Sequence, residues 1–155
     1  PKLYIENSIV SYLTAHPSRD IITAARQELT RQWWHTKRLD YDLYISEFVI
    51  SEAAAGDADA AARRLEVLDE IPEIALRETA VVLAERLVKD GPLPEKAALD
   101  ALHIAAAVSG GVEYLLTWNF KHLANATIRN QIEQLCRSMG YEPPIICTPE
   151  ELLGE

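Results

Sequence analysis

Short apolar runs alternate along this chain with longer segments in which apolar residues recur every three or four positions. The runs predict β-strands at residues 2–5, 43–45, 114–117 and 144–147, with a weaker strand at 73–76. The segments between them have the periodicity of amphipathic helices. Strands that alternate with helices predict a parallel sheet covered by helices on both faces, which is an α/β fold.

Capping and helix-breaking residues set the limits of the predicted helices. Helices are expected at about residues 8–15, from Ser18 or Asp20 to about 37, after Ser46, after Asp57, at about 78–89, 95–109 and 126–139, and after Thr148. Of the adjacent Trp33 and Trp34, one is expected to pack inside and the other to lie on a surface. Without repeats or linkers, residues 1–155 are predicted to form a single domain.

Three acidic residues lie where such a sheet places its functional site. Ligands bind at the carboxyl ends of parallel strands, and Glu6 directly follows the first strand. Glu52 lies in the helix after the second strand, and we prefer it to Glu47, which fits a first-turn acid behind the Ser46 cap. Asp100 lies within the apolar helix at 95–109. A carboxylate there is costly to bury without a partner, so we expect it to serve the site.

Each of these residues has a second interpretation that the sequence leaves open. Glu6 also suits the N-terminus of the next helix, through the helix dipole. Asp100 also suits a pair with Lys96, four residues earlier on an exposed stripe. Asn119, which closes the run at 115–119, is expected either to face the site or to cap the following helix.

Four further polar residues are expected near these acids. Ser8 and Thr117 are predicted to orient ligands or water, although Ser8 is equally suited to cap a helix. His103 lies one turn beyond Asp100, and its alternatives are a supporting or substrate-contacting role and a buried, hydrogen-bonded core histidine. His122 is expected on the surface, and its alternative is a contact with phosphate together with Lys121.

A cluster of carboxylates predicts a divalent cation. Like charges held together raise one another's pKa unless a cation lies between them. Oxygen ligands without cysteine or paired histidine suit Mg²⁺ or Mn²⁺ better than zinc. Such an ion activates water and neutralises phosphodiester oxygens.

The ordered set of motifs resembles the PIN domain, and within it the VapC-like ribonuclease toxins of bacterial toxin–antitoxin pairs. The matching segments, in the order and spacing of that family, are residues 4–8, 46–52, 100–107 and 115–119. The resemblance spans almost the whole chain. It implies a three-layer α/β/α PIN-like fold with a parallel sheet of about five strands. It also implies Mg²⁺- or Mn²⁺-dependent hydrolysis of RNA, a cognate antitoxin and a homodimer.

The resemblance implies metal ligation by Glu6, Glu52 and Asp100, with Asn119 as a fourth catalytic position. Two positions depart from the family pattern. Glu6 stands where Asp is usual, and it is followed by Asn7 rather than Thr or Ser. Asn119 stands where a fourth acid is common, which removes one negative charge. These changes favour one well-held metal over two.

Composition places the chain among globular proteins. Apolar residues make up 48% and charged residues 25% of 155 residues, and no run approaches the length of a membrane span. The N-terminal stretch lacks the apolar region and cleavage site of a signal peptide. Cys136 and Cys147 lack CxxC spacing and are expected to be reduced core thiols. A cytoplasmic protein with no membrane partner is therefore expected.

The net charge of −9 argues against a nucleic-acid substrate. A cation among the acids would reverse the local field, and basic residues gathered on one rim would attract RNA. The candidates for that rim are Arg19, Arg26, Arg31, Lys37, Arg38, Lys121 and Arg129. Two alternatives to an endoribonuclease remain: a catalytically degenerate PIN-like protein-binding module, and a phosphate-ester hydrolase acting on small nucleotides.

Overall fold

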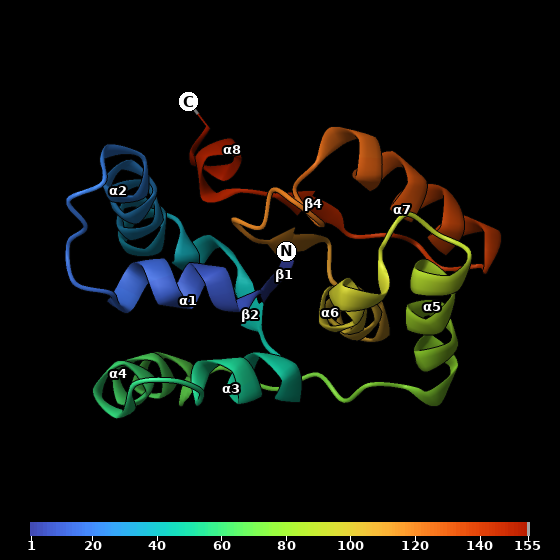
Figure 1. The fold of residues 1–155 in the computed structure, drawn as a ribbon, viewed down its shortest axis with the longest axis horizontal. Helices are drawn as coiled ribbons and strands as arrows, with labels where there is room; N and C mark the ends of the chain where they lie inside the picture. Colours follow the sequence, from blue (N-terminus) through green and yellow to red (C-terminus); the bar gives the residue numbers. More distant parts are fainter. Residues whose placement is uncertain (155) are drawn as a thin grey trace.

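The computed structural model describes residues 1–154, and it is a mixed α/β structure (Figure 1). The strands are β1 (Lys2–Ile5), β2 (Asp42–Tyr44), β3 (Tyr114–Leu116) and β4 (Ile145–Cys147). The α-helices are α1 (Asn7–Thr14), α2 (Ile21–Thr36), α3 (Glu47–Ala53), α4 (Ala58–Leu68), α5 (Glu78–Lys89), α6 (Ala98–Ser109), α7 (Ala126–Ser138) and α8 (Pro149–Leu153). Short 3₁₀ helices, η1 (Arg38–Asp40) and η2 (Glu95–Ala97), precede β2 and α6.

The strands form a parallel four-stranded sheet in the order β2-β1-β3-β4. In its register Tyr4 of β1 lies opposite Tyr44 of β2 and Leu115 of β3. The residues that follow β1, β2 and β3 therefore emerge side by side at one edge of the sheet. This edge is the one at which α/β proteins place their sites.

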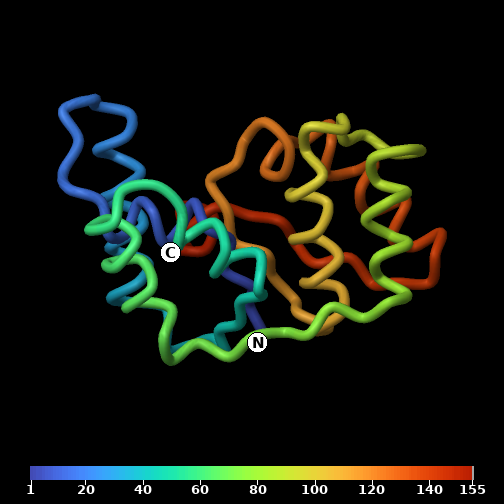
Figure 2. Tube along the Cα trace, turned by 60° about the horizontal axis from the view of Figure 1, so that its bottom comes forward, coloured from blue at the N-terminus to red at the C-terminus, as the bar shows by residue number. Residues whose placement is uncertain are grey.

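Helices lie on both sides of the strands, as the expected three-layer arrangement requires. Figures 1 and 2 both show α1 to α4 on one side and α5 to α7 on the other. Helix α1 packs on α2, α3 and α4, while α5 packs on α6 and α7. The final helix α8 lies against α2. The predicted α/β fold with helices on both faces of a parallel sheet is confirmed.

The core is built on the two central strands and the apolar helix α6. Leu3, Tyr4 and Ile5 of β1 are fully buried, which explains why this strand is a continuous apolar run. Helix α6 buries a series of small residues, Ala101 and Ala105 among them, which lets it approach its neighbours closely. Trp33 is fully buried and Trp34 only partly, as expected for the adjacent pair.

The predicted fifth strand at residues 73–76 does not form, so this prediction is wrong. The segment makes one isolated bridge, in which Ile45 lies opposite Glu73. Ile45 N donates to Pro72 O and Ile74 N donates to Ile45 O. Pro72 has no N–H to extend the ladder backwards, and Arg77 N already donates to Ser109 Oγ ahead of α5. The segment therefore crosses the sheet edge without adding a strand.

The other predicted elements are present with ends shifted by a residue or two. Asp20, rather than Ser18, caps α2 by accepting from Thr23 N. The segment predicted as one helix from residue 95 begins as the 3₁₀ helix η2. Cys136 and Cys147 are buried free thiols, as predicted. Within residues 1–154, no helix has both the length and the apolar character needed to cross a bilayer.

Candidate functional site

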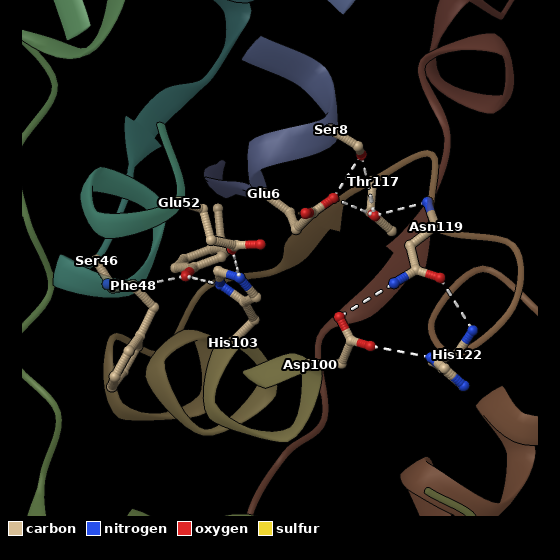
Figure 3. Close-up of polar contacts among 11 residues, drawn as sticks. Glu6, Ser8, Ser46, Phe48, Glu52, Asp100, His103, Thr117, Asn119 and His122 are labelled. Atoms are coloured by element: carbon tan, nitrogen blue, oxygen red, sulfur yellow. Dashed lines mark hydrogen bonds and ion pairs between the residues drawn. The ribbon is translucent and has the colours of Figure 1, made fainter. Parts of the chain in front are cut away.

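Glu6 lies at the point where β1 ends and α1 begins. Its backbone N donates to Leu116 O on the neighbouring strand, which fixes it beside Thr117. Its carboxylate atom Oε1 accepts from Ser8 Oγ at 2.5 Å and from Thr117 Oγ1 at 2.6 Å (Figure 3). The expected orienting roles of Ser8 and Thr117 thus have a geometric basis, because both hold the same carboxylate oxygen.

The Glu6 carboxylate is buried, with 5% of the residue exposed. Burial raises the pKa of Glu6, and the charge of His103 and the hydrogen bonds from Ser8 and Thr117 lower it by less. A carboxylate in this position is ionised at a cost unless a cation compensates for its lost hydration. A positive charge beside Glu6 would therefore stabilise its ionised form.

Glu52 joins Glu6 through the second turn of α3. Its Oε1 lies 2.5 Å from Nε2 of His103, which is fully buried. Nδ1 of His103 lies 2.6 Å from Tyr4 Oη, and Tyr4 Oη lies 2.6 Å from Ser46 Oγ. With a neutral imidazole, Nε2–H donates to Glu52, Tyr4 donates to Nδ1, and Ser46 donates to Tyr4.

These contacts decide between alternatives that the sequence left open. His103 is a buried histidine with both ring nitrogens hydrogen-bonded, and its Glu52 contact also makes it part of the site. The preferred Glu52 lies at the site while Glu47 is exposed at the start of α3. One ligand atom from each of Glu6, Glu52 and His103 lies within 4.8 Å of the others.

Asp100 lies one helical turn before His103 on α6 and turns its carboxylate toward a different pair of residues. Oδ1 accepts from Asn119 Nδ2 at 3.1 Å, and Oδ2 lies 3.1 Å from Nδ1 of His122. Burial raises the pKa of Asp100, opposed by His103 and His122. Across residues 1–154 Asp100 forms no ion pair with Lys96, so the exposed-stripe alternative is not what the structure shows.

Asn125 caps the following helix α7 by accepting from Thr127 N, so the capping interpretation of Asn119 is wrong. Asn119 Oδ1 accepts from His122 N at 3.0 Å and holds the turn after β3, while its Nδ2 faces Asp100. His122 is half-buried against Asp100, so its expected surface placement is wrong. Asn119 N also donates to Thr117 Oγ1. One polar network thus runs from Glu6 through Thr117 and Asn119 to Asp100 (Figure 3).

Comparison with known proteins finds similarity in structure but none in sequence. No family model matches the chain, and no curated protein matches it in sequence. Solved structures do match: VapBC-1 of nontypeable Haemophilus influenzae aligns with a TM-score of 0.57 at 12% identity, over 97% of this chain and 99% of that one. VapBC2 of Rickettsia felis, bound to a DNA fragment from its promoter, gives 0.53 at 14% identity, over 96% and 98%.

A third match is VapC20 of Mycobacterium tuberculosis, a sarcin-ricin loop cleaving toxin. It aligns with a TM-score of 0.51 at 17% identity, over 74% of this chain and 87% of that one. The fold of this chain is therefore similar to that of these VapC and VapBC structures. Likeness at these identities concerns the fold, so the chemistry of the PIN-like site rests on the residues of this chain.

The residues of this PIN-like site suit a hard divalent cation. The carboxylates of Glu6 and Glu52 supply oxygen donors, and His103, whose two ring nitrogens are both hydrogen-bonded, would orient Glu52. Burial raises the pKa of Glu6 because it disfavours the charged form, and a cation bound beside the carboxylate would favour the ionised form again. Asp100 faces Asn119 and His122 and lies outside the set of three, so its place as a ligand remains a prediction.

Proposed function

We propose that this chain is a Mg²⁺- or Mn²⁺-dependent endoribonuclease, the toxin of a toxin–antitoxin pair. The observation that supports it most is the buried Glu6 carboxylate, which lies with Glu52 and His103 at the carboxyl edge of a PIN-like sheet. Hydrogen bonds from Ser8 and Thr117 offset only part of the cost of burying this acid, and a bound cation would offset more of it.

In this proposal Glu6 and Asp100 hold the metal, and Glu52 binds it directly or through water. When bound, the ion supplies an activated water and neutralises phosphodiester oxygens. The other polar residues position these ligands. Ser8 and Thr117 fix the Glu6 carboxylate, His103 fixes Glu52, and Asn119 and His122 fix Asp100.

The partners of the protein follow from the same proposal. RNA as substrate is supported by the likeness to VapC20, which cleaves the sarcin-ricin loop. A cognate antitoxin is supported by the likeness to two VapBC structures. A homodimer and a cytoplasmic site of action complete the proposal by analogy with such toxins.

The direct test is an RNA cleavage assay with purified protein and Mg²⁺ or Mn²⁺. Asp100→Asn keeps the shape of the side chain and removes its charge, so cleavage should fall to background. Asp59→Asn, on the exposed first turn of α4, is the matched control and should cleave like the wild type. Equal activity of the wild type and Asp100→Asn on every RNA would remove the basis of the proposal.

A specific observation favours a second candidate, the degenerate PIN-like binding module. Asp100 is engaged by Asn119 and His122, and Asn119 itself supplies no charge. A Mn²⁺ titration separates the two, because a degenerate site takes up no ion above non-specific levels. The small-nucleotide hydrolase, which the charge of −9 favours, is separated by comparing turnover of mononucleotides and RNA.

A further inference from the structure

One large aromatic side chain lies exposed directly beside the candidate site. Phe120 follows Asn119 in the turn after β3 and is 41% exposed. Its neighbour two residues earlier, Trp118, is 5% exposed. A single exposed apolar side chain is ordinary. The position of Phe120 next to Asn119, and the group that lies on its ring, are what distinguish it.

The guanidinium of Arg26, from α2, lies over this aromatic pair. It is 4.7 Å from the centre of the Phe120 ring and 5.9 Å from that of Trp118. The two rings are themselves 5.9 Å apart at 55°. Within the described chain, Arg26 forms no ion pair with a carboxylate. We call Arg26, Trp118 and Phe120 the aromatic platform. Its guanidinium rests on π-faces, and its charge also acts on the Asp20 carboxylate at the start of α2.

The platform is held in place and joined to the site. Trp118 Nε1 donates to Thr30 Oγ1 at 2.8 Å, which fixes the indole against α2. Trp118 N donates at 2.8 Å to Ser8 Oγ, the hydroxyl that itself donates to Glu6. A platform ordered before binding loses less conformational entropy when a ligand arrives.

The basic residues expected to form a rim differ in their position relative to the platform and in their ion pairs. Lys121 is exposed immediately after Phe120. Lys37 and Arg38 lie ahead of β2, at the opposite edge of the parallel sheet, so they cannot share this rim. Arg31 and Arg129 are each paired with a glutamate. Of the remaining candidates, Arg19 is exposed ahead of α2, Arg26 belongs to the platform and Lys121 follows Phe120.

We propose that Phe120 and Arg26 form a stacking site for an unpaired nucleobase of the RNA substrate, adjacent to Asn119 at the candidate site. Aromatic rings and guanidinium planes stack unpaired bases, and paired bases in a duplex are not free to do so. This inference rests on the proposed ribonuclease function and deepens it. It makes Phe120 a substrate-binding residue and Arg26 its partner.

The test uses the full chain in EDTA, where no cleavage occurs, with single-stranded RNA oligonucleotides that carry 2-aminopurine at successive positions. Stacking of 2-aminopurine on the platform should quench its fluorescence at one position, and the same probe in a duplex should give no quenching. Phe120→Ala should weaken binding by about tenfold or more, because base–aromatic stacking is worth that much per base. Phe120→Tyr and Phe120→Trp should restore both affinity and quenching.

Matched variants separate stacking from hydrophobic contact and from charge. Phe120→Leu keeps an apolar side chain and should lose quenching. Arg26→Lys should keep the salt dependence of RNA binding. Arg26→Gln should make the slope of log binding constant against log salt concentration shallower by about 0.7 if one phosphate contact is lost. Leu39→Ala, which trims an 89% exposed side chain ahead of β2, should leave RNA binding unchanged. Circular dichroism of each variant checks that it is folded.

The outcomes for the stacking site and for the proposed function differ. If the wild type cleaves RNA with metal while Phe120→Ala and Phe120→Leu keep its affinity, KM and quenching, the stacking site alone is overturned. The exposed ring would then belong to a protein surface. If the wild type neither binds nor cleaves any RNA, the proposed function fails and the stacking site fails with it.

Discussion

At the scale of single residues, the buried charge of Glu6 lowers the stability of the metal-free protein, while the proposed function requires it. Ser8 and Thr117 both donate to its Oε1, so glutamine keeps the two hydrogen bonds and removes the buried charge. Glu6→Gln should therefore raise the free energy of unfolding of the metal-free protein at neutral pH. RNA cleavage should fall by about 100-fold or more, since even outer partners of a metal are worth 10- to 100-fold. Urea unfolding and the cleavage assay measure the two effects.

The control for this prediction is Glu47→Gln, an exposed acid on the same side of the sheet. It should leave cleavage at the wild-type value and lower the free energy of unfolding by no more than about 1 kcal/mol, the usual contribution of an acid in the first turn of a helix. A Glu6→Gln protein that unfolds more easily and cleaves normally would show that Glu6 is a structural residue.

The raised pKa of Glu6 also predicts how metal binding depends on pH. A group whose pKa is raised on folding stabilises the protein while protonated, and that contribution is lost as pH rises through the folded pKa. The metal requires the ionised form, so Mn²⁺ affinity should rise over the same interval. Asp100, whose pKa burial also raises, acts in the same direction. The increase in melting temperature caused by Mn²⁺ should therefore grow as the pH rises from the ordinary carboxyl range toward neutrality.

This dependence is measured by thermal unfolding with and without Mn²⁺ across that range. Glu6→Gln should flatten most of it. A Mn²⁺ effect that stays constant with pH would show that neither buried carboxylate binds the ion.

How far the site was predictable depends on how far apart its partners lie in the sequence. Local rules were enough to select Glu6 and Glu52 as candidates. Glu6 directly follows a strand, and Glu52 was preferred because Glu47 is explained as a first-turn acid behind the Ser46 cap. The contact between Tyr4 and His103 joins residues 99 positions apart, so no local pattern could show it. The same holds for His122, whose contact with Asp100 depends on how the turn after β3 closes around Asn119.

At the scale of elements, the segment at residues 73–76 packs closely on the end of α6, where Ile74 lies against Gly110. A Cβ added at Gly110 would lie 2.4 Å from Cδ1 of Ile74. Gly110→Ala should therefore lower the free energy of unfolding by about 1–3 kcal/mol, the usual cost of overpacking. Urea unfolding with an unchanged m-value measures it.

A double-mutant cycle provides the control. Ile74→Ala removes the atoms that the new methyl group would meet, so adding Gly110→Ala to it should cost much less than it does alone. Additive effects of the two substitutions would place the cost of Gly110→Ala in the helix end rather than in the contact with Ile74.

The elements themselves were largely predictable because each reflects a local pattern. The apolar runs that became β1 to β4 are short and bounded by capping residues, and Asp20 and Ser46 cap their helices as local rules require. The strand at 73–76 was wrong because a strand also needs a partner ladder. Ile45 offers that segment hydrogen bonds at one position, and Pro72 cannot extend them.

At the scale of the whole molecule, the two cysteines report on global unfolding. Burial raises the pKa of Cys136 to about 11 and that of Cys147 to about 12. At about pH 8 the native protein should therefore resist iodoacetamide, and both thiols should react once urea unfolds the chain. Mass spectrometry counts the added groups. Rapid labelling of either thiol under native conditions would mean that its surroundings open without unfolding of the rest.

The whole molecule also shows that chains with little sequence identity can share a fold. The chain shares 12% identity with VapBC-1 and still matches it over nearly its whole length. Apolar runs in a parallel sheet tolerate many residue combinations of similar volume. The central claim is that the acids at the carboxyl edge of the sheet hold a metal.

A calorimetric titration of the purified, metal-free protein with Mn²⁺ tests that claim most directly. The proposed site predicts one saturable binding event per chain at neutral pH, lost in Glu6→Gln and kept in Glu47→Gln. Heats no larger than non-specific binding, or a titration that Glu6→Gln leaves unchanged, would contradict the metal site and favour the protein-binding module.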